Sequence, residues 1–267
     1  MAVDSHIQVP KSILRHFRME NGKILHYDFD TDRIRSCGVK RLGIAHGYYS
    51  ERMEQYLSRT VEAPFLQSTN KIISFLDGPD SYLSLNMDIE NHLKRFIKAA
   101  AARSSMAWRS FFHNSVYAQF FDDQSNHDRL ILHCIESHTV RFFDFENYHM
   151  AILQNETGCP FVLPRNCFYV VFSNGYRCIV TPISPLCALA LVPDDYQGLF
   201  EPYGPKVTAP LIQKDVIWIM NQTALEYEYV YNRDFVACTD KQELQRLQVF
   251  LKTHHTELEK ELESVCH

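Results

Sequence analysis

Three side chains, far apart along this sequence, could together perform acid–base chemistry on an anionic substrate without a cofactor. His6 precedes a helix led by Pro10, and an imidazole with a pKa of about 6.5 can act as a general acid or base. Arg103 offers a planar, permanently charged guanidinium that can bind a phosphate or a carboxylate. Tyr231 could donate a proton or stack on a nucleobase. The alternatives are structural: a capping or packing histidine, an exposed helix arginine and a core tyrosine.

Two glutamates could bind a cation or pair with the arginine. Glu54 and Glu62 stand eight residues apart, about two helical turns, so they share a face if their helix is continuous. Paired carboxylates can hold Mg²⁺. Either carboxylate could instead form a buried or half-buried ion pair with Arg103. Pro64 is expected to kink or interrupt this helix, and we predict neither a metal site nor a cofactor.

One asparagine is expected to act as a structural hub. Asn221 follows Met220 on an otherwise apolar helix face, and a buried asparagine must find hydrogen-bond partners. We expect it to bridge the backbone of the turn at Ser184 and Pro185, which joins two predicted strands.

Composition and missing motifs narrow the classes of function. The net charge of -5 argues against general polyanion binding, although a local basic groove is compatible with it. The eight cysteines include no C-x-x-C pair, and phosphate-loop, serine-hydrolase and zinc-protease motifs are absent. The first residues lack the features of a secretory signal, and the longest apolar runs fall short of the roughly 20 residues of a membrane span. We therefore expect a cytoplasmic protein that does not associate with a membrane.

Hydrophobic periodicity divides the chain into helices and strands. Helices are predicted over residues 11–17, 50–57, 65–76, 87–111, 214–227 and from Thr239 onward. Strands are predicted over residues 23–29, 33–38, 148–154, 161–163, 168–172, 177–180 and 186–192. Residues 128–145 are compatible with strands or with a buried helix.

Two features of the C-terminal region carry further predictions. A short extended stretch is expected over residues 229–231. Thr239 and Gln242 are expected to form a capping box for the last helix. That helix carries leucines at near-heptad spacing, which could dock a partner or a second copy of the chain: Leu244, Leu247, Leu251, Leu258 and Leu262.

These elements predict a mixed α+β fold. The N-terminal hairpin of residues 23–38 is expected to join a mainly antiparallel sheet built from residues 148–192, covered by helices from the middle and the end of the chain. We expect a single domain over residues 1–267, with a helical part up to about residue 145 and a β-rich part after it. In this fold His6, Arg103, Asn221 and Tyr231 could meet in one cleft.

Five stretches, in order, resemble a bacterial family known as domain of unknown function 4238. They are residues 6–17 with the hairpin after them, 53–62, 102–105, 159–166 with 181–185, and 219–221 with 229–231. The resemblance implies a shared fold and a short set of positions, but no reaction. The family usually carries Ser-Asp shortly after its Pro-Phe strand, whereas this chain reads Leu163-Pro164-Arg165-Asn166.

Two hypotheses of function follow. The first is an enzyme acting on RNA or another phosphodiester, as an effector in a bacterial conflict or defence system, because His, Arg and Tyr can move protons and stabilise an anionic phosphorane. The second is a non-catalytic interaction module that binds a protein partner or self-associates through its last helix.

Overall fold

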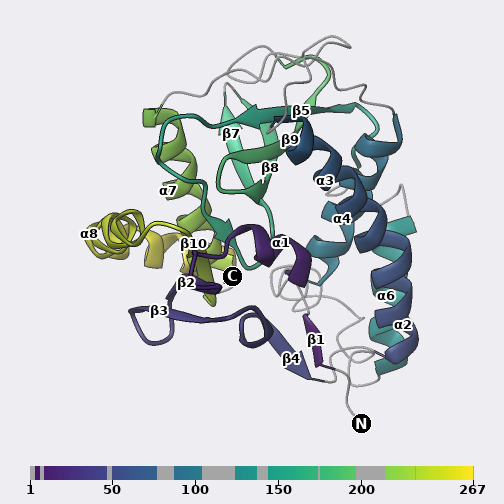
Figure 1. The fold of residues 1–267 in the computed structure, drawn as a ribbon, viewed down its shortest axis with the longest axis horizontal. Helices are drawn as coiled ribbons and strands as arrows, with labels where there is room; N and C mark the ends of the chain where they lie inside the picture. The colour runs from purple at the N-terminus through teal and green to yellow at the C-terminus, as the bar shows by residue number, and fades with distance from the viewer. Residues whose placement is uncertain are drawn as a thin grey trace.

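The computed structural model describes residues 4–6, 9–46, 50–76, 87–103, 124–136, 144–173, 175–196, 214–231 and 233–266. Within these ranges the chain forms two four-stranded antiparallel sheets, a separate pair of short strands, and helices around them. Figure 1 shows α2, α3, α4 and α6 gathered on one side of the molecule, with α7 and α8 on the other. The predicted mixed α+β class is confirmed.

The larger sheet contains the strands predicted between residues 148 and 192. Its order is β5 (Tyr148–Gln154), β9 (Cys187–Pro193), β8 (Tyr176–Ser184) and β7 (Tyr169–Ser173). The central strand β9 is buried along almost its whole length, as its unbroken apolar sequence requires. Helix α7 covers β7, where the Phe168 and Tyr227 rings lie 5.8 Å apart. Asn174, between β7 and β8, lies outside the described residues.

The N-terminal hairpin belongs to the second sheet, so the expectation that it joins the sheet of residues 148–192 is wrong. The hairpin is formed by β2 (Lys23–Asp28) and β3 (Arg33–Gly38). Strand β10 (Phe235–Cys238) pairs with β2 on one side and with the two-residue strand β6 (Leu163–Pro164) on the other. All four β10 residues are buried, so their backbone groups need partners, and β2 supplies them.

Short elements connect the N-terminus to this second sheet. Strand β1 (Asp4–His6) pairs with β4 (Ile44–His46), and His6 stands opposite Ile44. Between these strands lie the predicted helix α1 (Lys11–His16) and the 3-10 turn η1 (Val39–Arg41).

A long helix runs through Pro64, which was predicted to kink or interrupt it. It consists of α2 (Glu51–Tyr56), the π-helical segment η2 (Leu57–Glu62) and α3 (Ala63–Leu76), with helical backbone angles at both junctions. Proline lacks the N–H donor of a helix residue, and its ring crowds the carbonyl one turn earlier. The wider π turn ahead of Pro64 makes room for the ring, so the helix continues. Ser50 caps the start of α2, its hydroxyl accepting from Met53 N at 3.1 Å.

Two central helices pack beside that long helix. Helix α4 (Met87–Ala102), within the helix predicted over residues 87–111, buries an apolar stripe that includes Leu93 and Phe96. Residues 104–123 lie outside the described ranges. Helix α6 (Gln124–Glu136) resolves the first half of the ambiguous segment as a helix. None of the helices in the described ranges combines the length and apolar character that crossing a membrane requires.

The C-terminal helices correct two predictions. Helix α7 (Lys214–Tyr231) includes residues 229–231, so the predicted extended stretch is wrong: Tyr229 and Val230 are buried, and packing outweighs their β-propensity. Helix α8 (Lys241–Cys266) is capped by Asp240, whose carboxylate accepts from Gln242 N at 2.8 Å, and not by Thr239.

The leucine seam of α8 packs within this chain. Leu244, Leu247, Leu251 and Leu258 are buried, and α8 contacts α7, β2, β3 and β10. These four leucines therefore do not form an exposed seam for self-association, and the side chain of Leu262 lies outside the described residues.

Candidate functional site

The side chain of Arg103 lies in the protein interior. It follows α4, has no exposed surface, and its Nη1 lies 2.9 Å from Glu62 Oε1 on η2, a carboxylate that is 18% exposed. Its Nε donates to the carbonyl of Ala99 at 3.2 Å. This geometry matches the ion-pair alternative for Arg103 and Glu62.

Further buried groups surround this ion pair. Burial raises the pKa of the Cys167 thiol; the charge of Arg103 opposes the shift, and the charges of Glu62 and Glu228 reinforce it. Glu228, on α7, has no exposed surface. The cluster of Glu62, Arg103, Cys167 and Glu228 thus links η2, α4, the segment after β6 and α7 around one guanidinium.

One of the two predicted carboxylates pairs with the arginine. Glu62 is turned to Arg103, while Glu54 is half-buried on α2. Among the described residues, no group of three or more His, Cys, Asp or Glu side chains could hold a metal ion.

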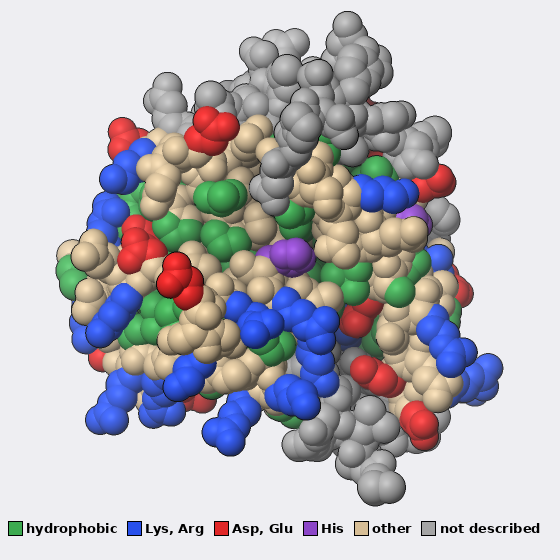
Figure 2. Space-filling view, viewed as in Figure 1, with side chains coloured by type: hydrophobic (Ala, Val, Ile, Leu, Met, Phe, Trp, Pro, Cys, Tyr) green, Lys and Arg blue, Asp and Glu red, His purple; other side chains and the backbone are tan. Residues whose placement is uncertain are grey.

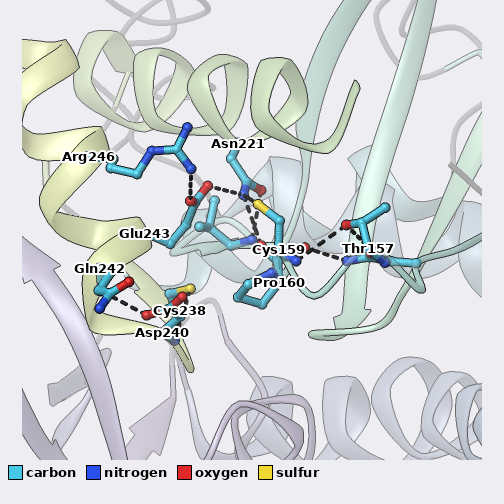
Figure 3. A network of polar contacts seen from close by, with 11 residues as sticks. Thr157, Cys159, Pro160, Asn221, Cys238, Asp240, Gln242, Glu243 and Arg246 are labelled. Carbon is cyan, nitrogen blue, oxygen red and sulfur yellow. Dashed lines mark hydrogen bonds and ion pairs between the residues drawn. The ribbon is translucent and has the colours of Figure 1, made fainter. Parts of the chain in front are cut away.

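Asn221 is a hub, but not at the predicted turn (Figure 3). Its Nδ2 donates to the Pro160 carbonyl and to Glu243 Oε1, both at 2.9 Å, and its Oδ1 accepts from Val162 N at 3.0 Å. Glu243 also receives Arg246 Nη1 at 3.1 Å. This network ties α7 and α8 to the segment that leads into β6.

The turn at Ser184 and Pro185 is held by another asparagine. Asn155 Nδ2 donates to the carbonyls of Cys159 and Pro185, at 2.6 and 3.2 Å. Ser184 Oγ accepts locally from Leu186 N at 3.3 Å. The predicted contact between Asn221 and this turn is therefore wrong, because Asn155 Nδ2 and Phe161 N together already occupy the carbonyl of Pro185.

The predicted cleft is not formed by Arg103 and Asn221. Each is buried and enclosed by its own partners, Arg103 by Glu62 and Asn221 by Glu243 and the backbone of residues 160–162. His6 and Tyr231 have described backbones, in β1 and at the end of α7, and their side chains lie outside the described residues.

An open pocket lies instead on one face of the second sheet. This sheet-face pocket has a volume of about 370 Å³. It is lined by residues of β2, β3, the η1–β4 loop and the β6–β10 edge: His26, Asp28, Arg35, Ser36, Cys37, Arg41, Leu42, Gly43, Ile44, Arg165, Asp234 and Phe235. Strand register explains the convergence, because His26 pairs with Arg35 across β2 and β3 and both point to the same side. Tyr27 points to the opposite, buried side of the same sheet, which α8 contacts.

Charge in the sheet-face pocket is mainly positive. Arg165 pairs with Asp234, and Arg35 Nη1 lies 3.6 Å from Asp28 Oδ2. Arg41 is exposed and makes no ion pair within the described part of the chain. The pocket therefore has one arginine more than its two carboxylates can neutralise.

Burial also shifts the pKa of two groups in this pocket, His26 and Cys37. Desolvation lowers the pKa of His26 below its usual value; the backbone at Ile24 and the charge of Asp28 oppose this shift, and the charge of Arg35 adds to it. Burial raises the pKa of the Cys37 thiol, against the charge of Arg41. His26 is thus a neutral imidazole near pH 7, the form that accepts a proton.

The surface around this pocket is basic. Figure 2 shows Lys and Arg side chains concentrated over the lower half of the face, where Figure 1 places β2, β3 and β4. Residues 11–46 carry eight Lys and Arg against four Asp and Glu, a net charge of +4. Because the whole chain has a net charge of -5, the remaining residues together carry -9. A local basic surface, compatible with the sequence, is therefore present.

Most of these pocket residues escaped sequence analysis. Arg165 drew attention only because it stands where the family usually has Ser-Asp; in the structure the nearby carboxylate comes from Asp234, 69 positions later. The available signals were the charge excess of residues 11–46 and the alternation of His26 with Asp28 on a predicted strand.

Comparison with known proteins gives one match. The model of the family described as "Protein of unknown function (DUF4238)" matches residues 6–199. Neither the curated proteins nor the solved structures contain a match. The matched range begins at His6, the last residue of β1, includes β2 to β9, and ends before α7, β10 and α8.

Proposed function

This chain belongs to the DUF4238 family, and we propose that it binds and cleaves RNA at the sheet-face pocket. One observation carries the proposal: three arginines and a buried histidine line the same pocket within the basic surface. Arginine is suited to phosphate because its guanidinium can form two parallel hydrogen bonds to phosphate oxygens. A basic surface of this kind favours a polyanion over a neutral substrate.

In the proposed reaction, His26 accepts the proton of a ribose 2′-hydroxyl. The 2′-oxygen then attacks phosphorus, a P–O2′ bond forms and the P–O5′ bond breaks, leaving a 2′,3′-cyclic phosphate. The departing O5′ takes up a proton, so protons and electron pairs balance. Arg35 and Arg41 stabilise the negative charge that builds on the phosphorane oxygens, and Asp234 holds Arg165 in place at the rim.

His6 keeps a role in this proposal. It stands opposite Ile44 in the β1–β4 pair, and Ile44 lines the sheet-face pocket. We propose His6 as the acid that protonates O5′, because a second histidine completes the proton transfer.

The test uses the purified full chain with a 5′-labelled single-stranded RNA and the DNA of the same sequence. We expect cleavage of RNA only, because DNA lacks the 2′-hydroxyl, and a loss of about 10²-fold or more in His26→Gln. Arg41→Ala should weaken RNA binding and reduce the slope of log K against log salt by about 1. Arg52→Ala, an exposed arginine on α2, is the matched control and should change neither.

Two outcomes would count against cleavage. Intact RNA at saturating protein, or equal cutting of DNA, would refute the proposed reaction. Salt-dependent RNA binding without cleavage would favour the alternative, a non-catalytic module. The proposed role as an effector in bacterial conflict predicts that induced expression arrests bacterial growth and that His26→Gln relieves the arrest.

A further inference from the structure

A second pocket, which shares no lining residue with the sheet-face pocket, lies between α4, α6 and the start of β5. This helix-face pocket has a volume of about 660 Å³, within the range of roughly 300–1,000 Å³ that holds small ligands. Its walls differ in character. One is the polar face of α4, and the other carries aromatic and acidic side chains from the region of β5 and β9.

The α4 wall presents three cations within five residues. Lys94, Arg95 and Lys98 line the pocket, since positions i, i+1 and i+4 share one helix face. Neighbouring groups hold two of them in position: Lys94 Nζ lies 2.7 Å from Glu90 Oε1, and Arg95 Nη2 donates to Tyr56 Oη at 2.7 Å. Lys98 is buried. Cations fixed in this way lose little side-chain entropy on binding an anion.

The opposite wall offers a ring surface and an oriented histidine. The Phe145 and Tyr148 rings pack edge to face at 5.6 Å beside the pocket. His149 Nδ1 lies 3.1 Å from Asp194 Oδ1, a carboxylate that is 59% exposed. His149 Nε2 is buried and has no hydrogen-bond partner in the described part of the chain.

These features together indicate which chemical groups a ligand of this pocket would carry. Its anionic end would face α4, a flat ring would lie against Tyr148, and hydroxyl groups would reach the Asp194 carboxylate, which His149 Nδ1 holds in place. A phosphate, a base and a ribose provide these three parts at the required ends. We propose that the helix-face pocket binds a nucleoside monophosphate.

Acidic and basic side chains both line this pocket, Glu90, Glu136, Glu146 and Asp194 against Lys94, Arg95 and Lys98, so a ligand needs hydrogen-bond donors as well as an anionic group. Burial lowers the pKa of Lys98, although the charges of Asp144 and Glu146 oppose the shift. A phosphate beside Lys98 would favour the charged ammonium in the same way, while the hydroxyls of a ribose would donate to the acidic side. A simple anion would leave the Asp194 carboxylate and the ring wall unused.

Calorimetric titration of the full chain with AMP, GMP, CMP and UMP tests the proposal. We expect at least one monophosphate to bind with a micromolar Kd, and its nucleoside and inorganic phosphate each to bind at least tenfold more weakly. Lys98→Met and Asp194→Asn should each weaken binding at least tenfold. Asp194 is well exposed, so its variant keeps the test valid if Lys98→Met fails to fold.

Two controls separate this site from others. Lys71→Met removes an exposed lysine from α3 and should leave nucleotide binding unchanged. Arg41→Ala alters the sheet-face pocket and tests whether the nucleotide binds there instead. Loss of nucleotide binding in Arg41→Ala would place the nucleotide in the other pocket and overturn the proposal. No binding of any monophosphate, or equal binding of inorganic phosphate, would also overturn it.

Discussion

Replacing Arg103 with methionine tests whether its ion pair with Glu62 supports the fold. Methionine keeps an unbranched side chain of similar length, so the change removes the charge and donors while leaving only a small cavity. The guanidinium has no exposed surface and Glu62 is 18% exposed. Its loss leaves the carboxylate of Glu62 without this partner and removes the positive charge near the fully buried Glu228.

The expected cost follows from that burial. Removing one partner of a buried ion pair costs about 3–5 kcal/mol, because the remaining charge stays desolvated. For a chain of this size, about 2 °C of melting temperature corresponds to 1 kcal/mol, so Arg103→Met should lower Tm by about 6–10 °C. Glu62→Gln should cost less, because Glu62 is partly exposed and an amide oxygen still accepts from the arginine.

Urea unfolding followed by circular dichroism gives the free energy of unfolding for the wild type, both single variants and the double variant. The double-mutant cycle should report a coupling energy of about 1–3 kcal/mol between Arg103 and Glu62. A cost below about 1 kcal/mol for Arg103→Met, or a coupling energy near zero, would refute the structural account. Loss of RNA cleavage at unchanged stability would instead return Arg103 to the catalytic residues.

Three further predictions rest on other buried groups. Asn221→Leu removes the partner of three hydrogen-bonding groups and should lower the free energy of unfolding in urea by about 2–4 kcal/mol. The control Gln222→Ala should lower it by less than about 0.5 kcal/mol. Equal losses in the two variants would contradict the role of Asn221 as a hub. The pKa of His26 is lower in the folded than in the unfolded protein, where it is about 6.5. The stability that neutral His26 contributes is therefore present above pH 6.5 and is lost as the pH falls from there toward the folded pKa. His26→Gln should flatten the stability–pH curve between pH 7 and 5 by up to about 1.4 kcal/mol per unit, and an unchanged slope would exclude this source. Iodoacetamide at pH 8 should modify half-buried Cys37 before buried Cys159, because burial raises the pKa of the Cys159 thiol to about 12. Peptide mapping follows the two reactions, and faster labelling of Cys159 would contradict its burial.

Elements with strong local patterns could be predicted from the sequence. The apolar stripe of α4 and the buried run of β9 are set by residues close together in the chain, and both were located. Strand β10 was missed because four residues give almost no periodicity, and its partner strand β2 lies about 200 positions away. The end of α7 was misassigned for a related reason: burial of Tyr229, and not its local propensity, decides its conformation.

Which residues meet in the candidate sites depends on strand register more than on sequence motifs. His26 and Arg35 meet because β2 and β3 pair in one particular register, which a sequence does not state. Glu243 was overlooked because it stands three residues after Asp240, where a capping glutamate usually points outward, whereas here it turns inward to Asn221. Partner choice among buried polar groups is a property of the assembled fold.

The central position of β10 also affects how the chain is made. Strand β2 leaves the ribosome before β10, the strand that covers its inner edge, and about 200 residues separate the two strands. At about 5–20 residues per second, roughly 200 residues take about 10–40 s. During that interval the edge of the N-terminal hairpin stays open to pairing with other strands, so a chaperone or a second nascent chain would encounter it first.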